Sequence, residues 1–241
     1  MELYLIRHAQ STNNTLTDET QRVRDPSLTD LGQRQAQILA QHLASGLTPE
    51  RVKYNSVEDT ASGQRHGYGL TRLYCSPMRR ALQTTQPISQ VLGLTPEVWV
   101  DTHEQGGIYL DHGEEIGRVG YPGLTRAEIL AEFPDFSLPE AITEQGWWRN
   151  GYEEWPVCQG RAIKVARQIR HWGTNEERVG LVSHGGFLDA LLKALFNQLP
   201  SRDMFYHHYN TAITRLDFRE DGRLSVRFIN RVDHLPTELI S

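Results

Sequence analysis

The sequence is poor in cysteine and has no apolar run long enough to span a membrane. Its two cysteines, Cys75 and Cys158, lie in unrelated segments without the spacing of metal ligands, so we expect free thiols in a reducing compartment. No charged and apolar leader precedes the first predicted strand. We therefore expect a cytoplasmic protein that does not enter a membrane.

The chain also lacks an excess of positive charge. Its formal net charge of -5 argues against nonspecific nucleic-acid binding, which needs a basic surface able to displace phosphate counterions. The ten histidines include no HExxH or HxH arrangement, and the neighbours His207 and His208 would point apart on a regular element, so no metal site is predicted. Any anion site must then be local. The sequence does not indicate an oligomeric state.

The order of the apolar segments predicts an α/β protein. At 241 residues the chain is long enough to bury a large core in one domain. Short apolar runs alternate with segments of helical periodicity, which is typical of a mostly parallel sheet covered by helices. The predicted strands are residues 3–6, 72–75, 98–100 and 179–183 and a terminal hairpin of 212–218 and 224–229. The predicted helices are residues 30–43, 78–92, 125–133, 157–172 and 188–195.

Two stretches do not fit this alternation. Residues 44–70 are polar and rich in Gly, Ser and Thr without a clear period, so we interpret them as a surface insertion. Residues 105–156 are irregular apart from the short predicted helix at 125–133, and we expect them to form a lid-like excursion held down mainly by the packing of Trp147, Trp148 and Trp155. Residues 1–241 would then form a single domain with two insertions.

Three of the predicted strands end in chemically useful side chains. Arg7 and His8 follow the first strand. Arg80 lies just beyond the second strand, and His184 follows residues 179–183. Because the carboxyl ends of parallel strands meet at one edge of a sheet, these groups can converge although they are far apart in sequence. Arginines hold phosphate oxygens by paired hydrogen bonds while a histidine approaches phosphorus in line, so the sequence predicts a phosphate pocket suited to phosphoryl transfer.

The same segments resemble the motifs of a known family. Residues 5–14, Leu-Ile-Arg-His-Ala-Gln-Ser-Thr-Asn-Asn, are similar to the signature Arg-His-Gly-x-Thr-x-x-Asn of the histidine phosphatase superfamily, the phosphoglycerate mutase-like enzymes. Ala9 and Ser11 replace the usual Gly and Thr, and Ser11 keeps the hydroxyl. The further matches are Leu28-Thr29-x-x-Gly32-x-x-Gln35-Ala36, Ser76-Pro77-Met78-Arg79-Arg80-Ala81-x-x-Thr84, Glu104, and Val182-Ser183-His184-Gly185-Gly186. Because these motifs occur in this order, the sequence resembles branch 1 of this superfamily.

The resemblance implies a three-layer α/β/α sandwich with a phosphoglycerate mutase-like fold. It makes His8 the nucleophile that becomes phosphohistidine. It makes Arg7, Arg80 and His184 the other members of the phosphate pocket. It also implies that the reaction needs neither a metal ion nor an organic cofactor, and that the partner is a small phosphorylated substrate.

The remaining site residues are also assigned by the resemblance. Glu104 would donate a proton to the leaving oxygen and then act as the base for water. Ser11, Asn14 and the backbone at Gly185 would be secondary contacts of the phosphate. The function that follows is a phosphomonoesterase acting on a small phosphorylated metabolite through a phosphohistidine.

Two alternatives share this fold. A cofactor-dependent phosphoglycerate mutase would return the phosphoryl group to a second hydroxyl, but the loop after Asn14 lacks the Phe-Thr-Gly-Trp-like stretch of those mutases. Glu104 is also followed by Gln-Gly-Gly instead of Arg-His-Tyr-Gly. A non-catalytic phosphate-binding protein is the second alternative, and the intact His8, Glu104 and His184 count against it. The sequence therefore favours hydrolysis.

Overall fold

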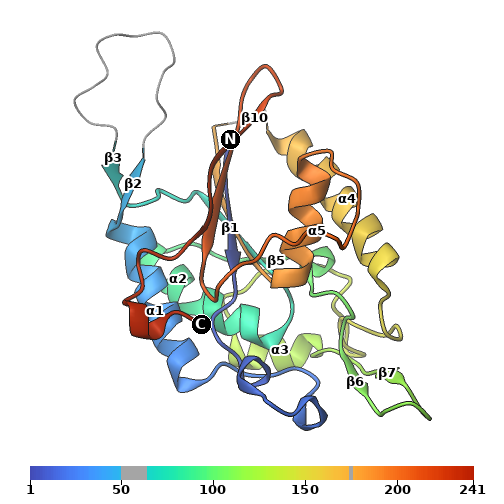
Figure 1. The fold of residues 1–241 in the computed structure, drawn as a ribbon. Coiled ribbons are helices and arrows are strands. Elements are labelled where there is room, and N and C mark those ends of the chain that lie inside the picture. The colour runs from blue at the N-terminus through green and yellow to red at the C-terminus, as the bar shows by residue number, and fades with distance from the viewer. Residues whose placement is uncertain (50–63, 174–175) are drawn as a thin grey trace, which may run out of the picture.

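The computed structural model describes residues 1–49, 64–173 and 176–241 (Figure 1). Its centre is a six-stranded sheet. In spatial order the strands are β10 (Leu224–Arg231), β9 (Ile213–Phe218), β1 (Glu2–Arg7), β8 (Arg178–Ser183), β4 (Arg72–Cys75) and β5 (Glu97–Val98). Strands β1, β8, β4 and β5 run parallel, and β9 and β10 form the predicted antiparallel hairpin. The sheet is therefore mostly parallel, as predicted.

Helices cover both faces of this sheet, which makes three layers (Figure 1). The helices are α1 (Asp30–Ser45), α2 (Arg79–Leu92), α3 (Arg126–Glu132), α4 (Trp155–Trp172) and α5 (Gly185–Leu195). Alternate residues of β1 point to opposite faces, so Tyr4 and Ile6 join one core cluster while Leu3 and Leu5 join the other. The first cluster contains α1 and α2, and the second contains α4 and α5. The predicted α/β/α sandwich is confirmed.

The ends of the helices follow from local capping chemistry. The Thr29 hydroxyl accepts a hydrogen bond from the Gly32 N–H at 3.0 Å and so begins α1. Thr125 and Glu128 form the capping box that begins α3. Gly93 ends α2 with φ of +64°, a left-handed conformation that glycine adopts without strain. These helix boundaries lie close to those predicted.

Strand β5 is shorter than predicted. The expected strand at residues 98–100 is paired only as far as Trp99, whose N–H donates to the Cys75 carbonyl at 2.8 Å. Strand β4 ends at Cys75, so the chain beyond this point has no strand to pair with. It turns instead into a short 3₁₀ helix, η3 (Val100–Thr102), which leads directly to Glu104. The other 3₁₀ helices are η1 (Thr12–Thr15), η2 (Glu19–Gln21) and η4 (Thr237–Leu239).

The two predicted insertions contain more structure than expected. In the first, residues 50–63 lie outside the described residues, and β2 (Leu47–Pro49) pairs with β3 (Gln64–His66). Its surface part ends earlier than predicted, because Tyr68 is fully buried with its ring 5.1 Å from that of Tyr4. The second contains α3 and the hairpin of β6 (Tyr109–Asp111) and β7 (Arg118–Gly120). Trp147 and Trp148 pack into the core, as predicted, whereas Trp155 is half-buried at the start of α4.

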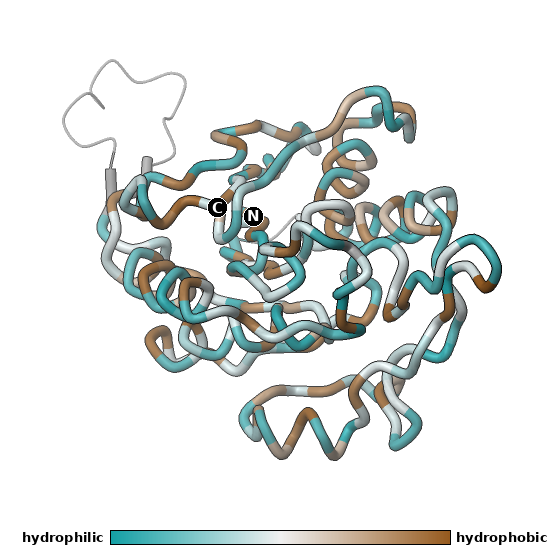
Figure 2. The backbone as a smooth tube through the Cα atoms, turned by 60° about the horizontal axis from the view of Figure 1, so that its bottom comes forward, coloured by the Kyte–Doolittle hydropathy of each residue, from teal (hydrophilic) through white to brown (hydrophobic). Residues whose placement is uncertain are grey.

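Polar and apolar residues are interspersed along the helices, as expected for helices that bury one face and expose the other (Figure 2). Cys75 and Cys158 are buried free thiols, and burial raises the pKa of each to about 12. In the part of the chain that the structure describes, no helix is both long and apolar enough to cross a bilayer.

Candidate active site

The side chains at the carboxyl ends of β1, β4 and β8 meet at one edge of the sheet. The rings of His8 and His184 lie with their centroids 5.1 Å apart. Arg80, near the start of α2, donates from Nε to His8 Nε2 at 3.1 Å. The structure thus brings together three of the residues that the strand-end argument placed at this edge.

His8 is held as a neutral imidazole whose Nε2 lone pair accepts the Arg80 Nε–H. Its Nδ1 lies 2.7 Å from the Ala9 carbonyl oxygen, so Nδ1 carries the proton and Nε2 is free to accept. Burial lowers the pKa of His8 well below its usual value, and the charges of Arg80 and Arg7 lower it further. Asn210 Nδ2 donates to the His8 carbonyl at 2.8 Å and fixes the backbone. An unprotonated, oriented Nε2 is what a nucleophilic histidine requires.

His184 is oriented by a hydroxyl from the neighbouring strand end. Its Nε2 lies 2.7 Å from Ser76 Oγ, which itself accepts the Met78 N–H at 3.3 Å. The Ser76 hydroxyl can donate to Nε2 while it accepts from Met78, and in that arrangement the neutral ring carries its proton on Nδ1. Burial, followed by the charge of Arg80, lowers the pKa of His184 well below its usual value. Ser76 was part of a matched motif, but the sequence did not predict this contact.

In the described part of the chain, neither of the two arginines forms a close ion pair with a carboxylate, although the charge of Glu104 acts on both. Arg7 Nη1 donates to the backbone carbonyl of His208. Arg80 Nη1 lies 3.9 Å from Asp25, whose carboxylate also accepts the Arg79 N–H at 3.1 Å. Burial lowers the pKa of each arginine and raises the pKa of Asp25 to about 6. Asp25 and His208 are contacts that sequence reasoning missed.

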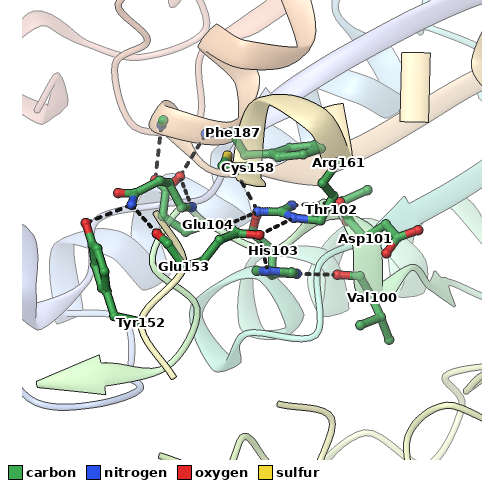
Figure 3. A network of polar contacts seen from close by, with 12 residues as sticks. Val100, Asp101, Thr102, His103, Glu104, Tyr152, Glu153, Cys158, Arg161 and Phe187 are labelled. Atoms are coloured by element: carbon green, nitrogen blue, oxygen red, sulfur yellow. Dashed lines mark hydrogen bonds and ion pairs between the residues drawn. The ribbon is translucent and has the colours of Figure 1, made fainter. Parts of the chain in front are cut away.

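Glu104 lies against the beginning of α5 (Figure 3). Its carboxylate accepts the N–H groups of Gly186 at 3.1 Å, Phe187 at 2.8 Å and Gln105 at 2.9 Å. The N-terminus of a helix favours a carboxylate in this position. The charge of Glu104 raises the pKa of Arg7, which opposes the effect of burial. Glu104 therefore lies within electrostatic range of the pocket.

Two buried nitrogen atoms in the pocket have no hydrogen-bond partner among the described residues: Arg7 Nε, which is a donor, and His184 Nδ1, which is a donor in the tautomer described above. Gly185 lies beside the first of them, since a β-carbon at Gly185 would be 3.6 Å from Arg7 Nε. Buried donors without partners are costly unless a ligand satisfies them. Together with the guanidinium groups of Arg7 and Arg80, these two nitrogen atoms could bind an oxyanion next to His8 Nε2.

A family model matches residues 3–61 and 60–231, nearly the whole chain. The chain belongs to the histidine phosphatase superfamily, branch 1. No curated protein matches it significantly in sequence.

Solved structures of two phosphatases share the fold of this superfamily member. Phosphoserine phosphatase from Entamoeba histolytica, in complex with phosphoserine, has 19% identity and a TM-score of 0.58 over 98% of this chain and 99% of that chain. A mycobacterial glucosyl-3-phosphoglycerate phosphatase has 21% identity and a TM-score of 0.56 over 96% of this chain and 99% of that chain. At this identity the likeness concerns the fold.

The signature residues Ser11 and Asn14 are paired with each other. Asn14 Oδ1 accepts from the Ser11 backbone N–H at 2.9 Å and from its hydroxyl at 3.0 Å, which caps η1. Ser11 is buried, whereas Asn14 is exposed. Their role as phosphate contacts stays a prediction. Within residues 1–49, 64–173 and 176–241, no group of three His, Cys, Asp or Glu side chains is arranged to hold a metal ion.

Proposed function

We propose that this chain is a phosphatase that hydrolyses a monoester of a small phosphorylated metabolite through a phosphohistidine on His8. The observation that carries the proposal is the neutral, oriented His8 Nε2 beside the two unpartnered donors, Arg7 Nε and His184 Nδ1. The enzymes that share its fold act on monoesters of this kind, phosphoserine and glucosyl-3-phosphoglycerate.

The reaction would run in two balanced steps. First, with Glu104 in its protonated form, His8 Nε2 exchanges the Arg80 Nε–H bond for the phosphorus and attacks in line, the P–O bond to the leaving group breaks, and the Glu104 proton goes to the departing oxygen. Second, the Glu104 carboxylate takes a proton from water, the hydroxide attacks phosphorus, and the P–N bond breaks to release phosphate. Arg7, Arg80 and His184 hold the three equatorial oxygens throughout.

The covalent step is tested by trapping. Brief incubation with ³²P-labelled substrate and an alkaline quench should leave label on the wild-type protein that acid removes, as expected for a phosphoramidate. His8→Ala should carry none. Turnover without trapped label, with inversion at phosphorus, would exclude the covalent intermediate. Transfer of label to an added alcohol such as glycerate, in preference to water, would identify a mutase instead.

The acid role of Glu104 is tested with two esters of similar size, benzyl phosphate and 4-nitrophenyl phosphate. Benzyl alkoxide is a poor leaving group that needs a proton, whereas nitrophenolate leaves almost unaided. Glu104→Gln should slow the phosphorylation burst about a hundredfold for the benzyl ester and spare it for the nitrophenyl ester. Equal slowing of both bursts would remove Glu104 from the acid role, and no effect would mean that another carboxylate acts.

A further inference from the structure

A buried ion pair lies directly behind the Glu104 loop (Figure 3). Arg161 of α4 donates two hydrogen bonds to the Glu153 carboxylate, from Nε to Oε1 at 2.9 Å and from Nη2 to Oε2 at 2.5 Å. Both side chains are less than a tenth exposed. Burial alone would raise the pKa of Glu153, but the His103 ring and Arg161 lower it to about 2, so the pair stays charged at every working pH.

The other donors of Arg161 bind the backbone that leads into Glu104. Its Nη1 donates to the carbonyl oxygens of Asp101 at 2.8 Å and His103 at 2.9 Å. Its Nη2 also lies 3.6 Å from Cys158 Sγ. All five N–H groups of the guanidinium therefore have partners. The peptide of His103 is the last one before Glu104, so Arg161 fixes the direction in which the Glu104 side chain leaves the loop.

Arg161 also contacts the group that holds the far end of the Glu104 side chain. Its guanidinium carbon lies 4.6 Å from the centroid of the Phe187 ring. The backbone N–H of Phe187 in turn donates to Glu104 Oε1 at 2.8 Å. One guanidinium thus contacts both the residue before Glu104 and a residue that binds its carboxylate. No contact joins Arg161 or Glu153 to His8, Arg80 or His184 in the described part of the chain.

We infer that the Glu153–Arg161 pair is a positioning device for the proton donor Glu104, an inference that rests on the proposed function. A buried ion pair adds little stability compared with apolar side chains of similar size, so its value here lies in orientation. The planar fork of arginine reaches two carboxylate oxygens and two carbonyls at once, which the single ammonium of lysine cannot do. A general acid must lie within hydrogen-bond reach of the leaving oxygen, so a small displacement of the loop reduces proton transfer.

The test separates positioning from folding. Arg161→Lys should slow the phosphorylation burst about tenfold for benzyl phosphate and less than about twofold for 4-nitrophenyl phosphate, because only the first ester needs the proton. The double variant Glu153→Met/Arg161→Met removes both charges without leaving either one buried alone, and it should show the same selectivity. In a Glu104→Gln background, Arg161→Lys should add no further selective loss.

The matched control is Arg215→Lys. Arg215 is also buried and ion-paired; it lies opposite Tyr4 in the middle of β1, and its partners Glu2 and Asp217 are at the amino end of that strand, away from the Glu104 loop. This variant should slow neither burst once the protein is folded. If Arg161→Lys slows the burst equally for both esters, or slows neither, the inference is wrong. The proposed function still stands in that case, provided that Glu104→Gln slows the burst selectively for benzyl phosphate. A non-selective Glu104→Gln would instead remove the acid role itself.

Discussion

Buried arginines occur at both ends of the central sheet, with different surroundings. Toward the amino end of β1, Arg215 is fully buried and meets the carboxylates of Glu2 at 3.1 Å and Asp217 at 2.8 Å. At the carboxyl end, Arg80 has one carboxylate at 3.9 Å and Arg7 binds a backbone carbonyl. The first arrangement neutralises its charge within the protein. The second leaves positive charge and free donors, which an anion can neutralise.

The largest expected effects come from removing one arginine at each end. Arg215→Met should lower the free energy of unfolding by about 3 kcal/mol, because the Glu2 and Asp217 carboxylates lose their fully buried partner and are left with the more distant Arg178 at 3.6 Å and Arg227 at 3.5 Å. It should leave the affinity of the folded protein for inorganic phosphate unchanged. Urea unfolding and calorimetric titration with phosphate measure the two quantities.

Arg7→Met should show the opposite pattern. It should weaken phosphate binding about 10- to 100-fold, the usual worth of a charge-assisted hydrogen bond, and should not lower the free energy of unfolding. If Arg7→Met destabilises the fold as much as Arg215→Met does, the two ends of the sheet do not differ in the way described.

The Glu153–Arg161 pair gives the next largest effect, because it is a neutralised pair next to the Glu104 loop. The pKa of Glu153 is lowered from 4.5 to about 2, so its stabilising contribution is complete above pH 4.5 and is lost as the pH falls toward 2. The contribution should be about 3 kcal/mol. The difference in unfolding free energy between wild type and Glu153→Gln, measured from pH 7 to pH 2.5, should shrink by that amount.

Asp111→Asn is the control for this titration. Asp111 pairs with Arg118 on the surface, where both side chains are about half exposed. Solvent screens such a pair, so its removal should change stability little at any pH. If the difference in unfolding free energy between wild type and Glu153→Gln does not change with pH, the charge state assigned to the buried pair is wrong.

Ser76→Ala should have a smaller effect, on the orientation of the His184 ring. Without the hydroxyl, His184 can carry its proton on either nitrogen, and we expect kcat/KM to fall about tenfold. The ¹⁵N spectrum of the imidazole should change from the Nδ1–H form to a mixture. Ser89→Ala, a buried serine of α2, is the control and should alter neither measurement. An unchanged imidazole spectrum in Ser76→Ala would show that the hydroxyl does not select the tautomer.

The smallest effect is expected from removing metal ions. If Arg7 and Arg80 supply the positive charge of the pocket, an excess of chelator should leave kcat and KM unchanged. A loss of activity that a divalent ion restores would mean that a metal ion, and not the two arginines alone, supplies the positive charge of the proposed pocket.

The strand-end argument predicted much of the site. His8, Arg80 and His184 follow segments whose apolar runs are readable in the sequence, and the geometry of parallel sheets brings such positions together. The supporting contacts were not predicted. Ser76 and His184 are 108 residues apart, Arg161 and His103 are 58 apart, and Asp25 and Arg79 are 54 apart. No local pattern marks a serine, an aspartate or an arginine as the partner of a distant group.

The sequence by itself determined the order of strands and helices, the helix caps and the side chains that follow β1, β4 and β8, because periodicity and capping depend on residues within a few positions of one another. Only the tertiary structure decided which charges are neutralised. Arg215 and Arg7 are indistinguishable as residues in the sequence, and their difference arises from the carboxylates that folding places beside one and not the other. Burial and charge balance depend on the whole packed chain, since both are set by neighbours that are distant in sequence.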